Sequence, residues 1–200
     1  MPTERPDLYN TFQVLKERHS VPDLEVLPFG VRYMYGTDKD LFKDYLGCEY
    51  NGHLYIWHGT TDPGVEATRQ KEGGAAHLVL GFHPEIWRVR YHAQSVPTFT
   101  HLALCQPGKS PIKIWRDSNR NYKYDHGEPI QSSKVFYINF HRASIHILQH
   151  IGPYSYGCIV TQDKRDFDFF MNIVINSNMY KSNHNCDFSF LLLSSKEFPI

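Results

Sequence analysis

The sequence has few cysteines, no excess of charge and no long apolar run, and each shortage excludes a class of protein. Its four cysteines are far apart and form no C-x-x-C pair, which argues against a zinc ribbon or a thioredoxin-like motif. Lysine plus arginine and aspartate plus glutamate both number 21, so the charge does not indicate a nucleic-acid partner, which normally requires a basic surface. No apolar stretch approaches the length of a membrane span.

The N-terminal segment MPTERPDLYNTF is polar and lacks the apolar core of a secretory signal. We therefore expect a protein that is made in the cytoplasm without a signal peptide and whose thiols are reduced there. The twelve histidines form neither an H-E-x-x-H helix nor a compact Cys/His spacing, so they do not predict zinc.

The composition and length of the sequence predict one main domain, preceded by an N-terminal appendage. Hydrophobic residues make up 41% of the 200 residues, enough to build a core. Residues 1–48 are expected to be a helical appendage, with one helix around residues 8–15 and a second over 38–46. Residues 49–200 are expected to form the main domain.

From about residue 50, short segments rich in β-branched and aromatic residues alternate with turn-forming residues. This pattern predicts a mainly β fold, an antiparallel sandwich or barrel, with a few helices. One helix is expected over 164–176, with Asp163 as its N-cap and Phe167 and Phe170 on its buried face. The expected strands lie within residues 53–59, 76–82, 86–93, 100–106, 111–117, 135–141 and 188–193.

The segment HRASIHILQHIGPYSYGCIV (141–160) places His141 ahead of Cys158 and ends in a Ser-x-Gly-Cys turn. A thiol attacks as the thiolate, and its ordinary pKa is about 8.5, so an imidazole within hydrogen-bond reach would help as base and then as acid. Gly157 permits backbone conformations closed to other residues. The alternative is that Cys158 is a small buried apolar residue and His141 a polar residue at a strand end.

These blocks resemble the signature of the L,D-transpeptidase catalytic domain: a histidine, a spacer of about this length, and Ser/Thr-x-Gly-Cys. The similarity is more specific to a compact subset from phages and bacteria, and the matching blocks are INFHR and SYGCIV. HGTTDPG at 58–64 is similar to a Thr-Pro-x-Gly stretch of the broader family. The resemblance covers about residues 50–195 and implies the barrel-like or sandwich-like transpeptidase fold, with a helix after the catalytic turn.

The resemblance implies a cysteine enzyme whose partners are the stem peptides of peptidoglycan and which requires no cofactor. Cys158 would attack the amide carbonyl between an L-centre and the following D-residue and form an acyl-enzyme, with His141 as base and then acid. Capture of the acyl group by an amine would make the reaction a transpeptidation, and capture by water would make it a peptidase reaction.

The remaining implied site residues position these two groups. The backbone carbonyl of Arg142 would orient the imidazole, Ser155 would hold the turn, and the amides of Tyr156, Gly157 and the cysteine would bind the oxyanion. Two departures put acceptor specificity in doubt: Tyr156 stands where the family commonly has a second histidine, and Val160 stands where many members have an arginine. The planar guanidinium of Arg142 is an alternative partner for a substrate carboxylate.

Two other functions stay open: a non-catalytic module that binds cell wall, and a cysteine hydrolase of a different peptide substrate. The missing signal peptide fits a phage lysin, a virion component or a delivered effector. Such a protein would act in the cell wall or periplasm after delivery or lysis. A cytosolic role in recycling wall peptides fits as well.

The segment DSNRNYKYDHGE (117–128) places oxygen-bearing side chains at the ligand positions of an EF-hand loop, which predicts a structural Ca²⁺. The loop follows an expected strand instead of a helix, and Tyr122 occupies the position of the usual glycine. The favoured alternative is a polar β-hairpin held by Asx-turns. The candidate calcium ligands are Asp117, Asn119, Asn121, Asp125 and Glu128.

Overall fold

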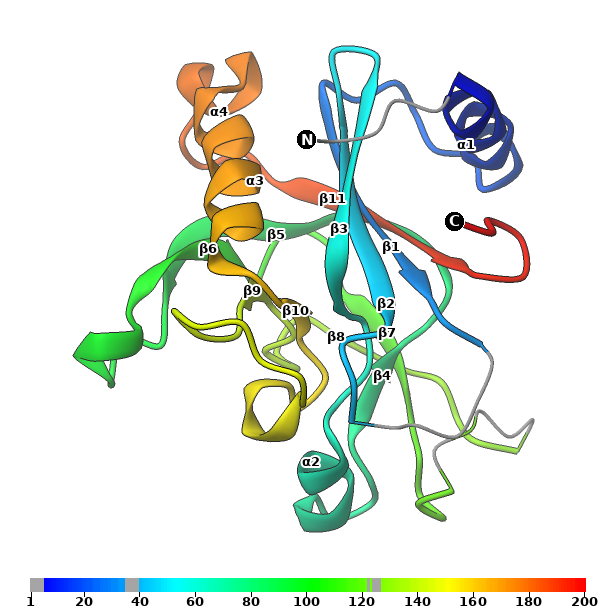
Figure 1. Ribbon diagram of the computed structural model, residues 1–200, viewed down its shortest axis with the longest axis vertical. Helices are drawn as coiled ribbons and strands as arrows, with labels where there is room; N and C mark the ends of the chain where they lie inside the picture. Colours follow the sequence, from blue (N-terminus) through cyan, green and yellow to red (C-terminus); the bar gives the residue numbers. More distant parts are fainter. Residues whose placement is uncertain (1–5, 35–39, 122, 124–126) are drawn as a thin grey trace.

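The computed structural model describes residues 6–34, 40–121, 123 and 127–200. Its main feature is a closed barrel in which the strand order is β1-β11-β5-β6-β9-β10-β3-β2 (Figure 1). The prediction of a mainly β, barrel-like fold with a few helices is confirmed. The barrel strands are β1 (Val26–Arg32), β2 (Asp44–Tyr50), β3 (His53–Thr60), β5 (Gly81–His92), β6 (His101–Cys105), β9 (Phe140–Arg142), β10 (Ile159–Thr161) and β11 (Phe188–Ser194).

A three-stranded sheet, β4-β7-β8, lies beside the barrel, and helices cover different sides of the molecule (Figure 1). In the part of the chain that the structure describes, no helix combines the length and apolarity needed to cross a membrane. These elements are β4 (Ala76–Leu78), β7 (Ile112–Arg116), β8 (Gln131–Ser133), α1 (Pro6–Arg18), α2 (Val65–Gln70), α3 (Lys164–Asn176), α4 (Asn178–Ser182) and the 3₁₀ turns η1 (Pro97–Phe99) and η2 (Gly152–Tyr154).

The helical expectation for residues 1–48 is correct only for α1. β1 and β2 are antiparallel neighbours within the barrel, and β2 crosses the expected boundary after residue 48. The prediction of a helix over 38–46 is wrong for the described residues of that range, because strand β2 already begins at Asp44. Both neighbours of β2 form ladders with it, and this tertiary pairing overrides a weak helical pattern.

Helix α3 forms over the residues expected for it and covers the inner face of the strands that carry the candidate site. Asp163 caps it, since its Oδ1 accepts a hydrogen bond from the backbone N of Arg165 at 2.8 Å. Phe170 is fully buried and stacks on Phe140 of β9 with ring centroids 4.7 Å apart. The helix therefore supports β9 from the core side.

The strand expected over 135–141 is much shorter than predicted, because β9 comprises only Phe140–Arg142. Side chains replace the strand ladder just before it: the backbone N of Ile138 donates to Gln106 Oε1, and the backbone N of Gln106 donates to Asn139 Oδ1, both at 2.9 Å. These bonds satisfy buried backbone groups without a partner strand. A further difference is that β1–β11 and β9–β10 are parallel pairs, whereas the pattern predicted antiparallel strands.

Candidate active site

The parallel pair β9–β10 carries both the candidate nucleophile and the candidate base. Ile159 lies opposite Phe140, and Val160 lies opposite His141. Ile159 and Phe140 are buried in the barrel core. Because side chains alternate between the faces of a sheet, Cys158 and His141 are directed to the other face. The register thus brings to one face of adjacent strands the two residues that the sequence singles out.

The thiol of Cys158 is half-buried and uncharged at rest. Its Sγ accepts a hydrogen bond from the backbone N of Asn139 at 3.5 Å and donates to the carbonyl O of Tyr137 at 3.6 Å. Burial raises the pKa of Cys158 to about 11. The surroundings of the sulfur therefore favour the thiol over the thiolate. The side chain packs against a cluster formed by Phe42, Ala143, Ile151 and Val160.

The imidazole of His141 is buried and has the tautomer required of a base. Its Nδ1 lies 2.8 Å from the carbonyl O of Arg142, and because a carbonyl only accepts, Nδ1 must carry the proton. The other nitrogen, Nε2, then has a free lone pair. Burial, and then the neighbouring His92, hold the pKa of His141 well below its ordinary value, so the ring is neutral. Among the described residues, no hydrogen bond joins it to Cys158.

The Ser-x-Gly-Cys turn is held by its own serine and by a close backbone contact. Ser155 Oγ donates to the carbonyl O of Cys158 at 2.8 Å, and the backbone N of Gly157 donates to that Oγ at 3.3 Å. Gly157 has φ of +129°, and a Cβ there would lie 2.6 Å from the carbonyl O of Ala76, so only glycine fits.

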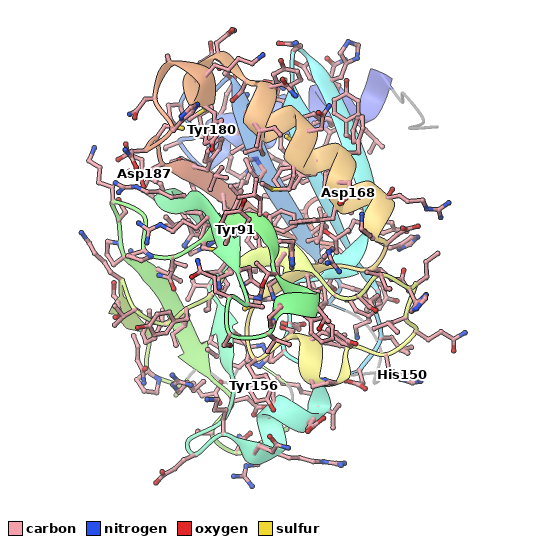
Figure 2. The ribbon with its side chains drawn as sticks, turned by 90° about the vertical axis from the view of Figure 1, so that its left-hand side faces the viewer. Tyr91, His150, Tyr156, Asp168, Tyr180 and Asp187 are labelled. Carbon is pink, nitrogen blue, oxygen red and sulfur yellow. The ribbon has the colours of Figure 1, made fainter. Side chains whose placement is uncertain are left out.

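The two positions that depart from the family pattern have structural roles of their own. The Tyr156 hydroxyl donates to Gln70 Oε1 at 2.7 Å, and Figure 2 shows this tyrosine at the same end of the molecule as α2. Val160 is fully buried. The amide of Gly157 is engaged with Ser155, while within the described chain the amides of Tyr156 and Cys158 donate no hydrogen bond. Of the three amides predicted to bind an oxyanion, these two are the ones without an internal acceptor among the described residues.

Two residues that sequence reasoning missed connect the thiol to the imidazole. The ring of His92 stacks on that of His141, with centroids 4.1 Å apart and an angle of 15°. Asn139 Nδ2 lies 3.2 Å from His92 Nδ1, and its Oδ1 is occupied by the backbone N of Gln106, which orients the amide. Asn139 therefore contacts the thiol through its backbone and His92 through its side chain.

No local signal marks His92, because the histidine-rich composition offers many equivalent candidates. It lies on β5, pairs with His101 of β6, and meets His141 only when the barrel closes. Burial, and then His101, lower the pKa of His92 to about 4, so the stacked pair is uncharged near neutral pH. Stacking of two neutral rings limits the orientations open to His141.

If the predicted cysteine chemistry takes place here, the His92→Ala variant should lower turnover about tenfold, because loss of the stacked ring lets the imidazole of His141 leave its orientation. The His92→Phe variant keeps a ring in the stack and should retain most of the turnover. Turnover numbers and the pH profile of both variants would be measured with muropeptides, the substrates that the sequence resemblance implies. Equal losses in the two variants would contradict an orienting role for the ring.

The acidic loop after β7 forms Asx-turns. Asn121 N donates to Asp117 Oδ1 at 2.9 Å and to Asn119 Oδ1 at 3.1 Å, and Lys123 N donates to Asn121 Oδ1 at 2.8 Å. Glu128 Oε1 accepts from the backbone N of Ser118 at 3.1 Å. The remaining candidate ligand, Asp125, lies outside the described residues. Among the described residues, no group of three or more His, Cys, Asp or Glu is placed to hold a metal.

These contacts are those of the polar hairpin, and on that alternative we expect a chelator to leave the melting temperature unchanged. The reason is that Asx-turn hydrogen bonds to Asp117 and Asn119 can hold the loop without a metal. Thermal unfolding with EDTA and with added Ca²⁺ would measure this. A rise in melting temperature with Ca²⁺ that EDTA reverses would instead support the calcium site.

Comparison with known proteins identifies no relative: no family model, no curated protein and no solved structure matches this chain.

Proposed function

We propose that this chain catalyses cysteine-dependent acyl transfer on peptidoglycan stem peptides, as an L,D-transpeptidase or L,D-peptidase. The supporting observation is the register of β9 and β10, which directs Cys158 and a neutral His141 to one face of the barrel wall. The Ser155-x-Gly-Cys turn, with its hydrogen-bonded serine, adds the sequence signature of that chemistry.

In the proposed reaction, proton transfer accompanies attack because the resting thiol is neutral. Cys158 Sγ bonds to the carbonyl carbon between the L-centre and the D-residue while its proton passes to His141 Nε2. The oxyanion is held by the amides of Tyr156 and Cys158. The C–N bond then breaks, and the imidazolium returns the proton to the leaving amine. An amine or water attacks the thioester in the second half of the reaction.

Two residues of the candidate site, Val160 and Arg142, are not placed to recognise the carboxylate of an acceptor. Val160 is an apolar residue enclosed in the cluster beside the thiol, so position 160 contributes no cation to a substrate carboxylate. Arg142 is also buried, and its established contact is the backbone carbonyl that orients His141. The carboxylate of a substrate would therefore be recognised by other residues.

Mass spectrometry of purified muropeptides incubated with the protein tests this proposal. A product that lacks the D-residue after the L-centre would show peptidase chemistry, and a product joined to a second stem peptide or to a free D-amino acid would show transpeptidation. Unchanged muropeptides together with cleavage of a casein-type substrate would favour the hydrolase of a different peptide.

A second candidate function, a wall-binding module without turnover, is supported by two observations that argue against a reactive thiol. Burial raises the pKa of Cys158 to about 11, and the described chain has no hydrogen bond between Cys158 and His141. Such a module would co-sediment with insoluble peptidoglycan, leave the muropeptides unchanged, and bind equally well as the Cys158→Ala variant.

We expect the rate at which iodoacetamide alkylates Cys158 to rise about tenfold per pH unit from about pH 7 to about pH 10. The reason is that a thiol whose pKa is raised to about 11 gains thiolate in proportion to hydroxide over this range. Peptide mapping by mass spectrometry would follow each cysteine separately. A rate that is already constant near neutral pH would show instead a thiolate paired with an imidazolium.

A further inference from the structure

A cavity of about 610 Å³ lies where β1 ends and β2 begins, and neither Cys158 nor His141 lines it. Its walls include the large apolar side chains of Trp115, Leu80 and Ile130. Leu80 and Ile130 are exposed, so they lie at the rim. An apolar cavity of this size with a few polar groups is typical of a site for a small organic ligand.

The charges at the inner wall are mostly satisfied within the protein. Arg32 donates to Thr61 Oγ1 at 3.1 Å, to the carbonyl O of Thr61 at 2.8 Å and to that of Leu78 at 2.9 Å, and its Nε lies 2.9 Å from Asp62 Oδ1. Asp44 accepts hydrogen bonds from the backbone N of Tyr33 and from the N and Oγ1 of Thr61. Arg32 and Asp44 therefore stabilise the wall.

His77 differs from these groups because one of its nitrogens has no hydrogen-bond partner in the part of the chain that the structure describes. Its Nδ1 lies 3.0 Å from Asp62 Oδ1, and its ring stacks on Trp115 with centroids 4.0 Å apart and an angle of 7°. Burial alone would raise the pKa of Asp62, but the neighbouring Arg32 and His77 hold this pKa well below its ordinary value. The carboxylate accepts a hydrogen bond from Nδ1–H, and in the neutral ring Nε2 is then the acceptor nitrogen. Nε2 is buried and without a hydrogen-bond partner among the described residues.

Basic side chains outnumber acidic ones around the cavity. Lys43 lies close enough to Asp62 to lower its pKa, and its Nζ is 5.4 Å from the centre of the Tyr33 ring. Lys196 is an exposed lining residue. With four basic and two acidic residues, the described lining has a formal charge of +2, which favours an anionic ligand. These residues are Arg32, Lys43, Lys123 and Lys196, with Asp44 and Asp62.

We propose that this cavity is a second, non-catalytic site for a small organic carboxylate with an apolar body and an N–H donor, such as an N-acylated amino acid. The apolar body lies on the walls formed by Trp115 and Leu80. The donor meets the unpartnered Nε2 of His77, and the carboxylate meets Lys43 and Lys196. A single negative charge suits a lining that already contains two carboxylates.

The site is separate from the thiol but adjoins it. Ile151 belongs both to the cavity lining and to the cluster against which Cys158 packs. The residue before His77 is Ala76, whose carbonyl contacts the turn at Gly157. The cavity and the turn therefore share structural supports without sharing polar groups.

Titration with N-acetyl-L-leucine, followed by NMR of the ¹⁵N-labelled protein, tests the proposal. We expect saturable shifts of the Trp115 indole and His77 imidazole signals in the millimolar range, and equal binding by the Cys158→Ala variant. The Trp87 indole, bonded to the carbonyl O of Ile138 in the core at 2.7 Å, is the internal control and should not shift. N-acetyl-L-leucinamide, which lacks the carboxylate, should bind about tenfold more weakly.

Variants of the lining complete the test. Lys43→Glu and Lys196→Glu should each weaken binding about tenfold, while Lys113→Glu, an exposed residue of β7 outside the lining, makes the same charge change and should not. His77→Gln should weaken binding if it folds, and the two lysine variants decide the question if it does not. The proposal is overturned by absence of a saturable shift, or by equal binding of the amide or of Lys43→Glu.

Discussion

Replacement of Cys158 by alanine should lower the rate of product formation from muropeptides at least about 10³-fold, because no other group in the proposed site can form the thioester. The fold should persist, since the side chain is half-buried and its hydrogen bonds are the long contacts to Asn139 N and Tyr137 O. Stability should change by about 1 kcal/mol or less. Mass spectrometry of the products, with denaturant unfolding of the same samples, would measure both quantities.

Cys186 provides the matched control. It is also a free, half-buried cysteine, but it lies next to Asp187, whose carboxylate pairs with Arg88, away from β9 and β10. The Cys186→Ala variant should retain full activity. Full activity in Cys158→Ala, whose circular dichroism and melting curve match the wild type, would disprove the proposed function while leaving the proposed carboxylate site untouched.

The Gly157→Ala variant should be strongly destabilised and inactive. Alanine is strained at φ of +129°, and its Cβ would lie 2.6 Å from the carbonyl O of Ala76, so the turn or β4 must move. We expect a loss of about 3 kcal/mol in the free energy of unfolding, as strain and steric overlap combine. Movement of the turn also displaces the amides of Tyr156 and Cys158, so the residual folded protein should not turn over substrate.

Substitution of Gly81 distinguishes backbone strain from steric overlap as the cause of this destabilisation. Its φ of +116° is similar, but a Cβ there would meet no atom within 4 Å. The Gly81→Ala variant should therefore show only backbone strain, about 1–2 kcal/mol, and should retain activity. Urea unfolding of the two variants would compare them. Equal destabilisation would show that the contact with Ala76 is unimportant and that the turn is not held against β4.

Local signals in the sequence determined the elements whose patterns are complete within a few residues. Helix α3 could be predicted because its N-cap, Asp163, and its apolar face repeat at helical spacing, and most strands could be predicted from β-branched and aromatic residues between turns. The candidate pair Cys158 and His141 also comes from a short motif. The fold class follows from the succession of these elements.

The tertiary structure alone decided the features that depend on partners distant in sequence. Residues 44–50 form a strand because β1 and β3 flank them, and β9 is short because the side chain of Gln106 binds the backbone before it. His92 reaches His141, and Asp62 reaches His77, only through closure of the barrel and packing of β4 beside it. Ring stacking and hydrogen bonding in the core depend on separation in space, and the composition does not indicate which histidine will pack against which partner.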